Sequence, residues 1–318
     1  MICGYAQIAF NDNTFSGVLL IIATWIGSPL QCAMAVWTTF VCTLCAYLVR
    51  IPKDLIRSGF YGFNAALSGL AIPLVLFPGE NFSFYMFCAT MIAAILCVFL
   101  TTFLRNFFGK WDVPALSAPY CAAVLILVVF VTFAGASDTS IISIDTLFFA
   151  TPLTNWTLPE IGSAVFNGAA QVLWVVKPIC GILYLLALLP ASRIDALNAI
   201  IATVVSTTMA IVLGLPKDAV LLGLYGFNSI LLMEVFSRGF LFSARSYLLN
   251  LAAAAFTPIL CAVFKVILAP LGLHSVLAFP YVSICIIVFL LRRKLKGLTY
   301  VPGKYWGVPE TIYKSFFH

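Results

Sequence analysis

A stretch of seventeen residues occurs twice in this chain of 318 residues, and the two copies are separated by a constant offset. Residues 51–67 read IPKDLIRSGFYGFNAAL, and residues 215–231 read LPKDAVLLGLYGFNSIL. Nine aligned positions are identical, and the same offset links Gln7 to Gln171, Gly17 to Gly181 and Ser28 to Ser192. We therefore interpret the chain as a duplication. Its function is expected where the two halves meet.

The composition indicates the solvent in which these halves fold. The chain is 63% hydrophobic and only 9% charged, with a mean hydropathy of +1.10. Soluble domains carry about 25% charged residues, so this chain has too few charges to cover a soluble surface. Long apolar runs separated by short polar breaks predict an all-α polytopic membrane protein. The partner that composition implies is a lipid bilayer, and the formal charge of +6 gives no reason to expect nucleic acid.

Apolar segments occur in two sets of five, one set in each half. They lie near residues 14–27, 30–49, 58–78, 82–104 and 113–135, and near 179–190, 195–214, 220–237, 246–270 and 276–291. Some are shorter than the ~20 residues that cross a bilayer, so these are tilted, extended or re-entrant. We predict four regions: a first transmembrane repeat (1–135), an extracellular linker (136–161), a second repeat (162–291) and a cytoplasmic tail (292–318).

The positive charges give the orientation. Lysines and arginines follow the second, fourth and tenth apolar segments, whereas residues 113–176, which include the linker, contain none. By the positive-inside rule, both termini are cytoplasmic and the linker is outside a cell membrane, plasma or inner. Since each half has five spans, an odd number, the two repeats have inverted topology. Such repeats place a pathway at their interface, near the bilayer midplane.

The sequence lacks the residues that several kinds of functional site require. Its two histidines are His274 and the C-terminal residue, so a pore built on paired intramembrane histidines is excluded. No phosphate-binding GxxxxGK[ST] loop occurs, and no nucleophile–base pair or metal cluster is evident, so we expect neither an enzyme nor a cofactor. Glu234 and Lys177 are unusual charges near apolar segments, which we interpret as interfacial or paired.

A neutral path lined by aromatic rings is the remaining interpretation. Each half has an aromatic residue four positions before a leucine, and a glutamine three positions before an aromatic residue; on a helix, such pairs share a face. The pairs are Phe63 with Leu67, Phe227 with Leu231, Gln7 with Phe10, and Gln171 with Trp174. A single phenylalanine in a membrane helix would simply pack, but repetition with its glycines and tyrosines favours a function. We predict two flat apolar slots, each beside an amide.

Two prolines are expected to interrupt helices along this path. Pro119 and Pro280 lie inside apolar segments and lack the N–H that an interior helical residue donates. A break at each would free backbone carbonyls at membrane depth, which is tolerated only against protein or a wet cavity. A flat solute with several N–H donors could lie between the rings and donate to these oxygens. A bare ion would find no fixed counter-charge there.

Four features resemble the urea transporter family. The first is the pair of YGFNxxL stretches at 61–67 and 225–231, and the others are AQIAFNDNTFSGVLL at 6–20, GKWDVPALSAPY at 109–120, and AQVLWVVKPICGILYLLAL at 170–188. The resemblance covers both repeats in the family's order. It implies a homotrimer with one pore per protomer, a re-entrant half-helix in each repeat, and facilitated diffusion of urea between aromatic slots and along an oxygen ladder.

The resemblance also implies site residues. They are Gln7, Phe10, Phe63 and Leu67 for one slot, Gln171, Trp174, Phe227 and Leu231 for the other, and Ser117 and Ala278 at the central constriction. We also predict Asn64 and Asn228 as pore residues. The family has threonine at both central positions, so Ala278 lacks a hydroxyl, and Trp174 replaces a smaller aromatic residue. We predict a passive channel for urea or a close planar analogue. An ion-coupled transporter of another small amide or amine, using Glu234 or Lys177, and a sensor without transport stay open.

Overall fold

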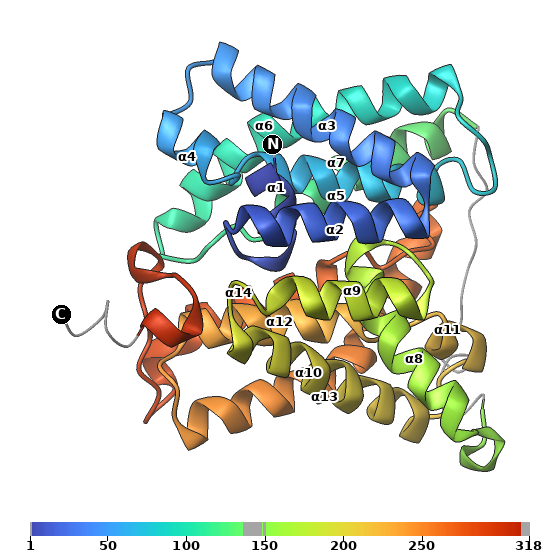
Figure 1. The fold of residues 1–318 in the computed structure, drawn as a ribbon, viewed down its shortest axis with the longest axis vertical. Helices are drawn as coiled ribbons and strands as arrows, with labels where there is room; N and C mark the ends of the chain where they lie inside the picture. Colours follow the sequence, from blue (N-terminus) through green and yellow to red (C-terminus); the bar gives the residue numbers. More distant parts are fainter. Residues whose placement is uncertain (1, 136–147, 149–150, 313–318) are drawn as a thin grey trace.

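The computed structural model describes residues 2–135, 148 and 151–312 (Figure 1). Most of the predicted linker and the last six residues of the predicted tail lie outside these described residues. Within the described residues, regular structure is helical, and β-structure is limited to one isolated antiparallel bridge between Phe240 and Tyr300.

The helices of the second half follow the order of the first. The first half contains α1 (Ile2–Ala6), the short 3₁₀ helix η1 (Gln7–Ala9), α2 (Thr14–Gly27), α3 (Pro29–Leu48), α4 (Lys53–Arg57), α5 (Gly62–Val75), α6 (Phe84–Gly109) and α7 (Ala118–Phe133). The second contains α8 (Leu158–Ala170), η4 (Gln171–Leu173), α9 (Pro178–Leu188), α10 (Arg193–Val212), α11 (Lys217–Leu221), α12 (Phe227–Gly239), α13 (Ala244–Leu268) and α14 (Phe279–Leu291). Each of the ten predicted apolar segments overlaps at least one of these helices, and α8 begins inside the predicted linker.

Several helices are suited to a bilayer. Five spans in the described residues are long and apolar enough to cross a membrane: α3, α4 with α5, α6, α10, and α13 with the residues after it. A sixth would be α8, extended by η4, with α9, which are bent by 66° at a short break. Two further helices, α2 and α7, are apolar but shorter. The chain is therefore a multi-pass membrane protein of helices with unequal lengths.

Repeated residues start or join equivalent helices in the same way. Ser28 accepts a hydrogen bond from a backbone N–H in the first turn of α3, and Ser192 does the same for α10, so each satisfies an orphan donor. Gly59 and Gly223 have φ of 80° and 76°, a conformation that favours glycine. A Cβ on Gly59 would also lie 2.4 Å from the backbone of Cys3, so the close approach of α1 requires the missing side chain.

The two halves pack along equivalent helices. In Figure 1, α2 and α9 lie side by side between the halves, and α7 also contacts α14. Lys177 reaches from the second half to the first, where its Nζ donates to the Ile26 carbonyl at 2.8 Å. The short helices α4 and α11 lie at opposite ends of the molecule in Figure 1.

The residues after α14 tie both halves together at the α4 end. Arg292 donates to the Trp111 carbonyl at 2.8 Å, and the Tyr300 hydroxyl donates to the Asp112 carbonyl at 2.6 Å, both in the loop before α7. Glu310 accepts the Ile194 N–H at the start of α10 at 3.1 Å. The basic C-terminal residues and the basic residues around α4 therefore occupy one end of the bundle (Figure 1).

Candidate pore between the two halves

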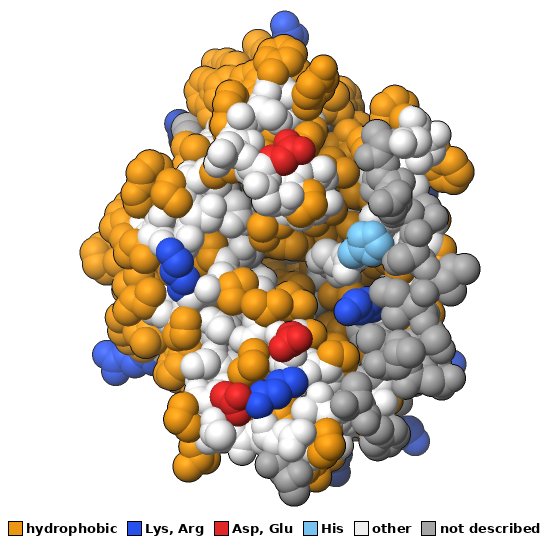
Figure 2. Space-filling view, turned by 90° about the vertical axis from the view of Figure 1, so that its right-hand side faces the viewer, with side chains coloured by type: hydrophobic (Ala, Val, Ile, Leu, Met, Phe, Trp, Pro, Cys, Tyr) orange, Lys and Arg blue, Asp and Glu red, His pale blue; other side chains and the backbone are white. Residues whose placement is uncertain are grey.

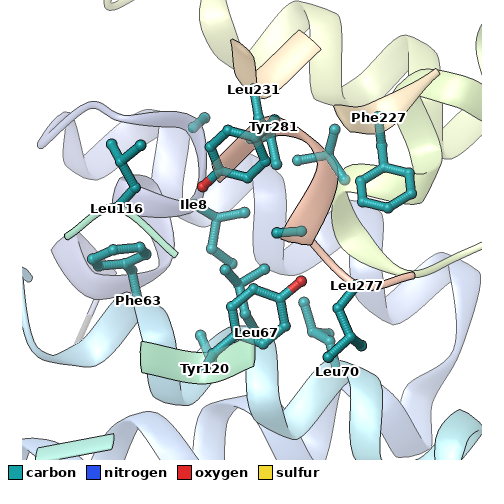
Figure 3. Packing of buried hydrophobic residues seen from close by; sticks show 14 of the residues in the cluster. Ile8, Phe63, Leu67, Leu70, Leu116, Tyr120, Phe227, Leu231, Leu277 and Tyr281 are labelled. Carbon is teal, nitrogen blue, oxygen red and sulfur yellow. The ribbon is translucent and has the colours of Figure 1, made fainter. Parts of the chain in front are cut away.

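Two short helices carry the repeated aromatic residues into the centre of the molecule. Phe63 is in the first turn of α5 and Leu67 is one turn further on, while Phe227 and Leu231 have the same places on α12. All four side chains are at most 6% exposed. Figure 3 shows Phe63 and Phe227 on opposite sides of one cluster, with the two leucines between them. The four repeated side chains thus occupy equivalent, buried positions on α5 and α12.

Each repeated asparagine braces the start of another helix. The Asn228 amide donates to the Leu277 carbonyl at 3.1 Å, and its oxygen accepts the Tyr281 N–H at 3.3 Å. Asn64 makes the equivalent contacts to the residues before and in α7, at 3.5 Å and 3.2 Å. Both asparagines are fully buried. They hold the first turns of α7 and α14 against α5 and α12, rather than standing free to contact a solute.

The two prolines do not interrupt helices as expected. Pro119 and Pro280 are each the second residue of a helix, where proline is tolerated because its missing N–H needs no helical partner. The chain before each helix contains a leucine with positive φ, 49° for Leu116 and 47° for Leu277. The carbonyls of these leucines accept the asparagine amides. Both helices therefore begin, rather than break, deep inside the protein.

Gln7 and Phe10 do not share a helix face as predicted. Gln7 opens η1, which ends at Ala9, and Phe10 has left-handed backbone with φ of 49°. Trp174 closes η4 in the same way, with φ of 59°. The chain turns at each aromatic residue, so this turn, rather than helical periodicity, sets the direction of the aromatic side chain. The short helices η1 and η4 still pack on α5 and α12, which brings each glutamine to the helix of its predicted slot.

The two glutamines differ in their surroundings. The Gln171 amide donates to the Leu222 carbonyl at 2.9 Å, and the side chain is 6% exposed. Gln7 is only partly buried. Because the Gln171 amide nitrogen is held by the Leu222 carbonyl, the side-chain oxygen of Gln171 has a fixed orientation.

Two buried tyrosines that sequence reasoning did not identify each lie beside a predicted constriction residue of the opposite half. The Tyr281 hydroxyl donates to Ser117 Oγ, and the Tyr120 hydroxyl lies near the backbone of Ala278. All four of these residues are buried, and Figure 3 shows both rings between Phe63 and Phe227. A signal for them existed, because a Pro-Tyr pair follows the equivalent leucine by three residues in both halves. The predicted constriction residues are thus brought together, with the Ser117 hydroxyl already bonded.

Charged side chains also occur in the interior. Arg238 forms a two-point ion pair with Asp195, with N–O distances of 3.1 Å and 2.7 Å. Glu234 lies one turn before Arg238 and is fully buried rather than interfacial. One of its oxygens accepts the Tyr184 hydroxyl at 3.0 Å, and the other has no partner. Sequence patterns gave no signal for Asp195 or Arg238 as a buried pair.

The end of the bundle that carries α11 has a hollow. Figure 2 shows this hollow near the centre of the face, with hydrophobic side chains beside it and acidic and basic groups further out. On this end, Lys217 pairs with Glu160 at 2.6 Å. Across the part of the chain that the structure describes, no three His, Cys, Asp or Glu side chains are grouped as metal ligands.

The sequence matches one protein family model and several known proteins. A family model described as urea transporter matches residues 1–293. Urea transporter 1 of Ovis aries is 26% identical over 318 residues, which cover 96% of this chain and 80% of that protein, and the same values hold for urea transporter 1 of Capra hircus. Urea transporter 1 of Mus musculus is 27% identical over 261 residues, covering 80% of this chain and 66% of that protein.

Proposed function

The chain belongs to the urea transporter family, and on that premise we propose that it is a passive channel for urea or a close planar analogue. The solute passes between the two halves, and no chemical conversion is involved. The observation that carries this proposal is the duplicated pair of aromatic and leucine side chains on α5 and α12, which converge on one central cluster (Figure 3).

The proposed path has three parts. Phe10, Phe63 and Leu67, with Gln7 beside them, form one slot, and Trp174, Phe227 and Leu231, with Gln171, form the other. Ser117 and Ala278, flanked by Tyr120 and Tyr281, form the constriction between the slots. Flat apolar walls accept a planar molecule, while the glutamine oxygens accept its N–H groups. An ion would lose its hydration there without gaining a fixed counter-charge, so it is excluded.

We further propose that the two halves are inverted repeats, each with a re-entrant half-helix, in a cell membrane with both termini cytoplasmic. The equivalent helices α4 and α11 at opposite ends of the bundle support the inversion (Figure 1). The basic residues around α4 and after α14 support a cytoplasmic location for their shared end. The short helices α7 and α14, which begin deep inside the protein, support the half-helices. Residues 1–135 and 162–291 form the repeats, the linker 136–161 is extracellular, and the assembly is a homotrimer.

A second candidate is ion-coupled transport, which the unpartnered oxygen of buried Glu234 favours. The test is stopped-flow light scattering on proteoliposomes under an inward urea gradient, with and without an imposed pH gradient and membrane potential. Urea entry that ignores both gradients supports the passive channel. Entry that follows either gradient supports coupling, and a Glu234→Gln variant that removes the dependence would assign it. No urea entry by folded protein contradicts both, and a panel of amides and amines would then test for another solute or for sensing.

A further inference from the structure

The backbone carbonyls of the two slot aromatics are both bound by the opposite half of the molecule. Phe10 belongs to the first half, and its carbonyl accepts a hydrogen bond from Arg238 of α12 at 3.0 Å. Trp174 belongs to the second half, and its carbonyl accepts one from Gln31 of α3 at 3.0 Å. Both donors are almost fully buried, at 2% and 4% exposed. Two buried contacts thus cross the interface at the residues where the chain turns into the slots.

Each donor also holds a second carbonyl, and the two second carbonyls are equivalent. The Gln31 amide nitrogen donates to Leu70 of α5 at 2.8 Å. Arg238 donates to Glu234 of α12 at 2.8 Å. Leu70 and Glu234 are separated by the repeat offset, as are Phe10 and Trp174. The same pair of backbone acceptors is therefore bridged in both halves.

The donors themselves are different in chemistry. The repeat offset pairs Gln31 with Asp195, not with Arg238. In the first half, one neutral amide bridges both carbonyls. In the second half, Asp195 holds the Arg238 guanidinium at two points, and the guanidinium bridges the carbonyls. Because Asp195 pairs with this cation, the slot at Phe10 is not left beside an unpaired positive charge.

These contacts matter because Phe10 and Trp174 have left-handed backbone, which residues with a Cβ rarely adopt. Such a conformation persists only where the surroundings hold it. Arg238 also lies over the Phe10 ring, 5.8 Å from its centroid. The donor therefore restrains both the turn and the ring at the first slot.

We propose that Gln31 and the Asp195–Arg238 pair are equivalent positioning devices, each of which fixes a slot aromatic of the opposite half and so sets the slot width. This inference rests on the proposed path and adds residues outside its lining. A wider or more variable slot admits bulkier solutes, so the devices act on selectivity between urea and N-methylurea more than on folding.

The test compares the flux ratio of urea to N-methylurea in proteoliposomes for wild type, Gln31→Leu and Arg238→Leu. We expect each substitution to lower the ratio about 2- to 10-fold, which is the change in population that loss of the one hydrogen bond to the slot aromatic produces. Asn198→Leu is the matched control, because Asn198 is buried one turn from Asp195 but donates within its own half, to Ser237 at 2.8 Å. We expect this control to keep the wild-type ratio.

A transplant separates positioning from general stability. The double variant Asp195→Gln with Arg238→Leu copies the first-half arrangement into the second half and avoids an unpaired buried Asp195. We expect it to restore the wild-type ratio, even if Arg238→Leu alone does not fold. The proposal is overturned if Gln31→Leu keeps the wild-type ratio, if Asn198→Leu lowers it equally, or if the transplant does not restore it. Wild-type protein that passes no urea would instead refute the proposed function.

Discussion

Substitution of Asn228 by alanine tests how the half-helix starts are held. The change removes the donor to the Leu277 carbonyl and the acceptor of the Tyr281 N–H, at a fully buried position. Each buried group left without a partner costs about 1–3 kcal/mol, so the loss is about 2–6 kcal/mol. The first turn of α14 is then free to shift, and Leu277 moves with it. We expect lower thermal stability together with lower urea flux.

The assay is thermal unfolding of purified protein, followed by size-exclusion chromatography, alongside urea flux in proteoliposomes. A protein of this size loses roughly 1–2 °C in Tm for each kcal/mol. The matched control is Ser229→Ala, at the residue that follows Asn228. This change removes one hydrogen bond, from the Ser229 hydroxyl to the Ala254 carbonyl at 3.1 Å, which contributes about 0.5–1.5 kcal/mol. Asn64→Ala should lie between them, because its 3.5 Å contact is longer than a normal hydrogen bond. Equal Tm losses in Asn228→Ala and Ser229→Ala would refute this reasoning.

Three further changes follow from the site and the C-terminal contacts. Phe227→Ala should lower urea flux without loss of assembly, because it removes one wall of a slot; wild-type flux would contradict the slot. Ala278→Thr should fold and conduct, since the family resemblance has threonine there, and misfolded protein would show a different local geometry. Burial alone would raise the pKa of the Glu310 carboxyl, but backbone N–H groups, including that of Ile194, lower it below its usual range. The contact therefore contributes stability at neutral pH that is lost below about pH 4. Hydrogen exchange near residue 310 should rise there, and Glu310→Gln should remove the pH dependence.

The sequence was sufficient to predict the helical class and the approximate positions of the helices, which follow the same order in the two halves. Repetition carried most of this information, because a residue type kept at one offset identifies equivalent positions without knowledge of their contacts. Phe63 with Phe227 and Asn64 with Asn228 are such pairs. The Tyr120 and Tyr281 pair was visible in the same way but occurs at a shorter offset, so the search at a single offset missed it.

What the sequence could not predict depends on contacts between distant segments. No local pattern indicates that Arg238 binds the carbonyl of Phe10, because a backbone acceptor has no residue type to recognise. The equivalent positions Gln31 and Asp195 differ in type, so repetition gives no signal either. The predicted direction of the Phe10 side chain was wrong because the backbone there makes a left-handed turn instead of a helix. The two prolines lie at the starts of helices because a leucine with positive φ turns the chain before each of them.

The central claim is that a planar amide lies between the halves, in two slots on either side of the central tyrosines. The most direct measurement is a crystal structure of the protein soaked in selenourea, with selenium located by anomalous scattering. The account predicts one selenium peak beside Phe63 and Leu67 and a second beside Phe227 and Leu231. Selenium found only outside the interface between the halves, in protein that conducts urea, would contradict it.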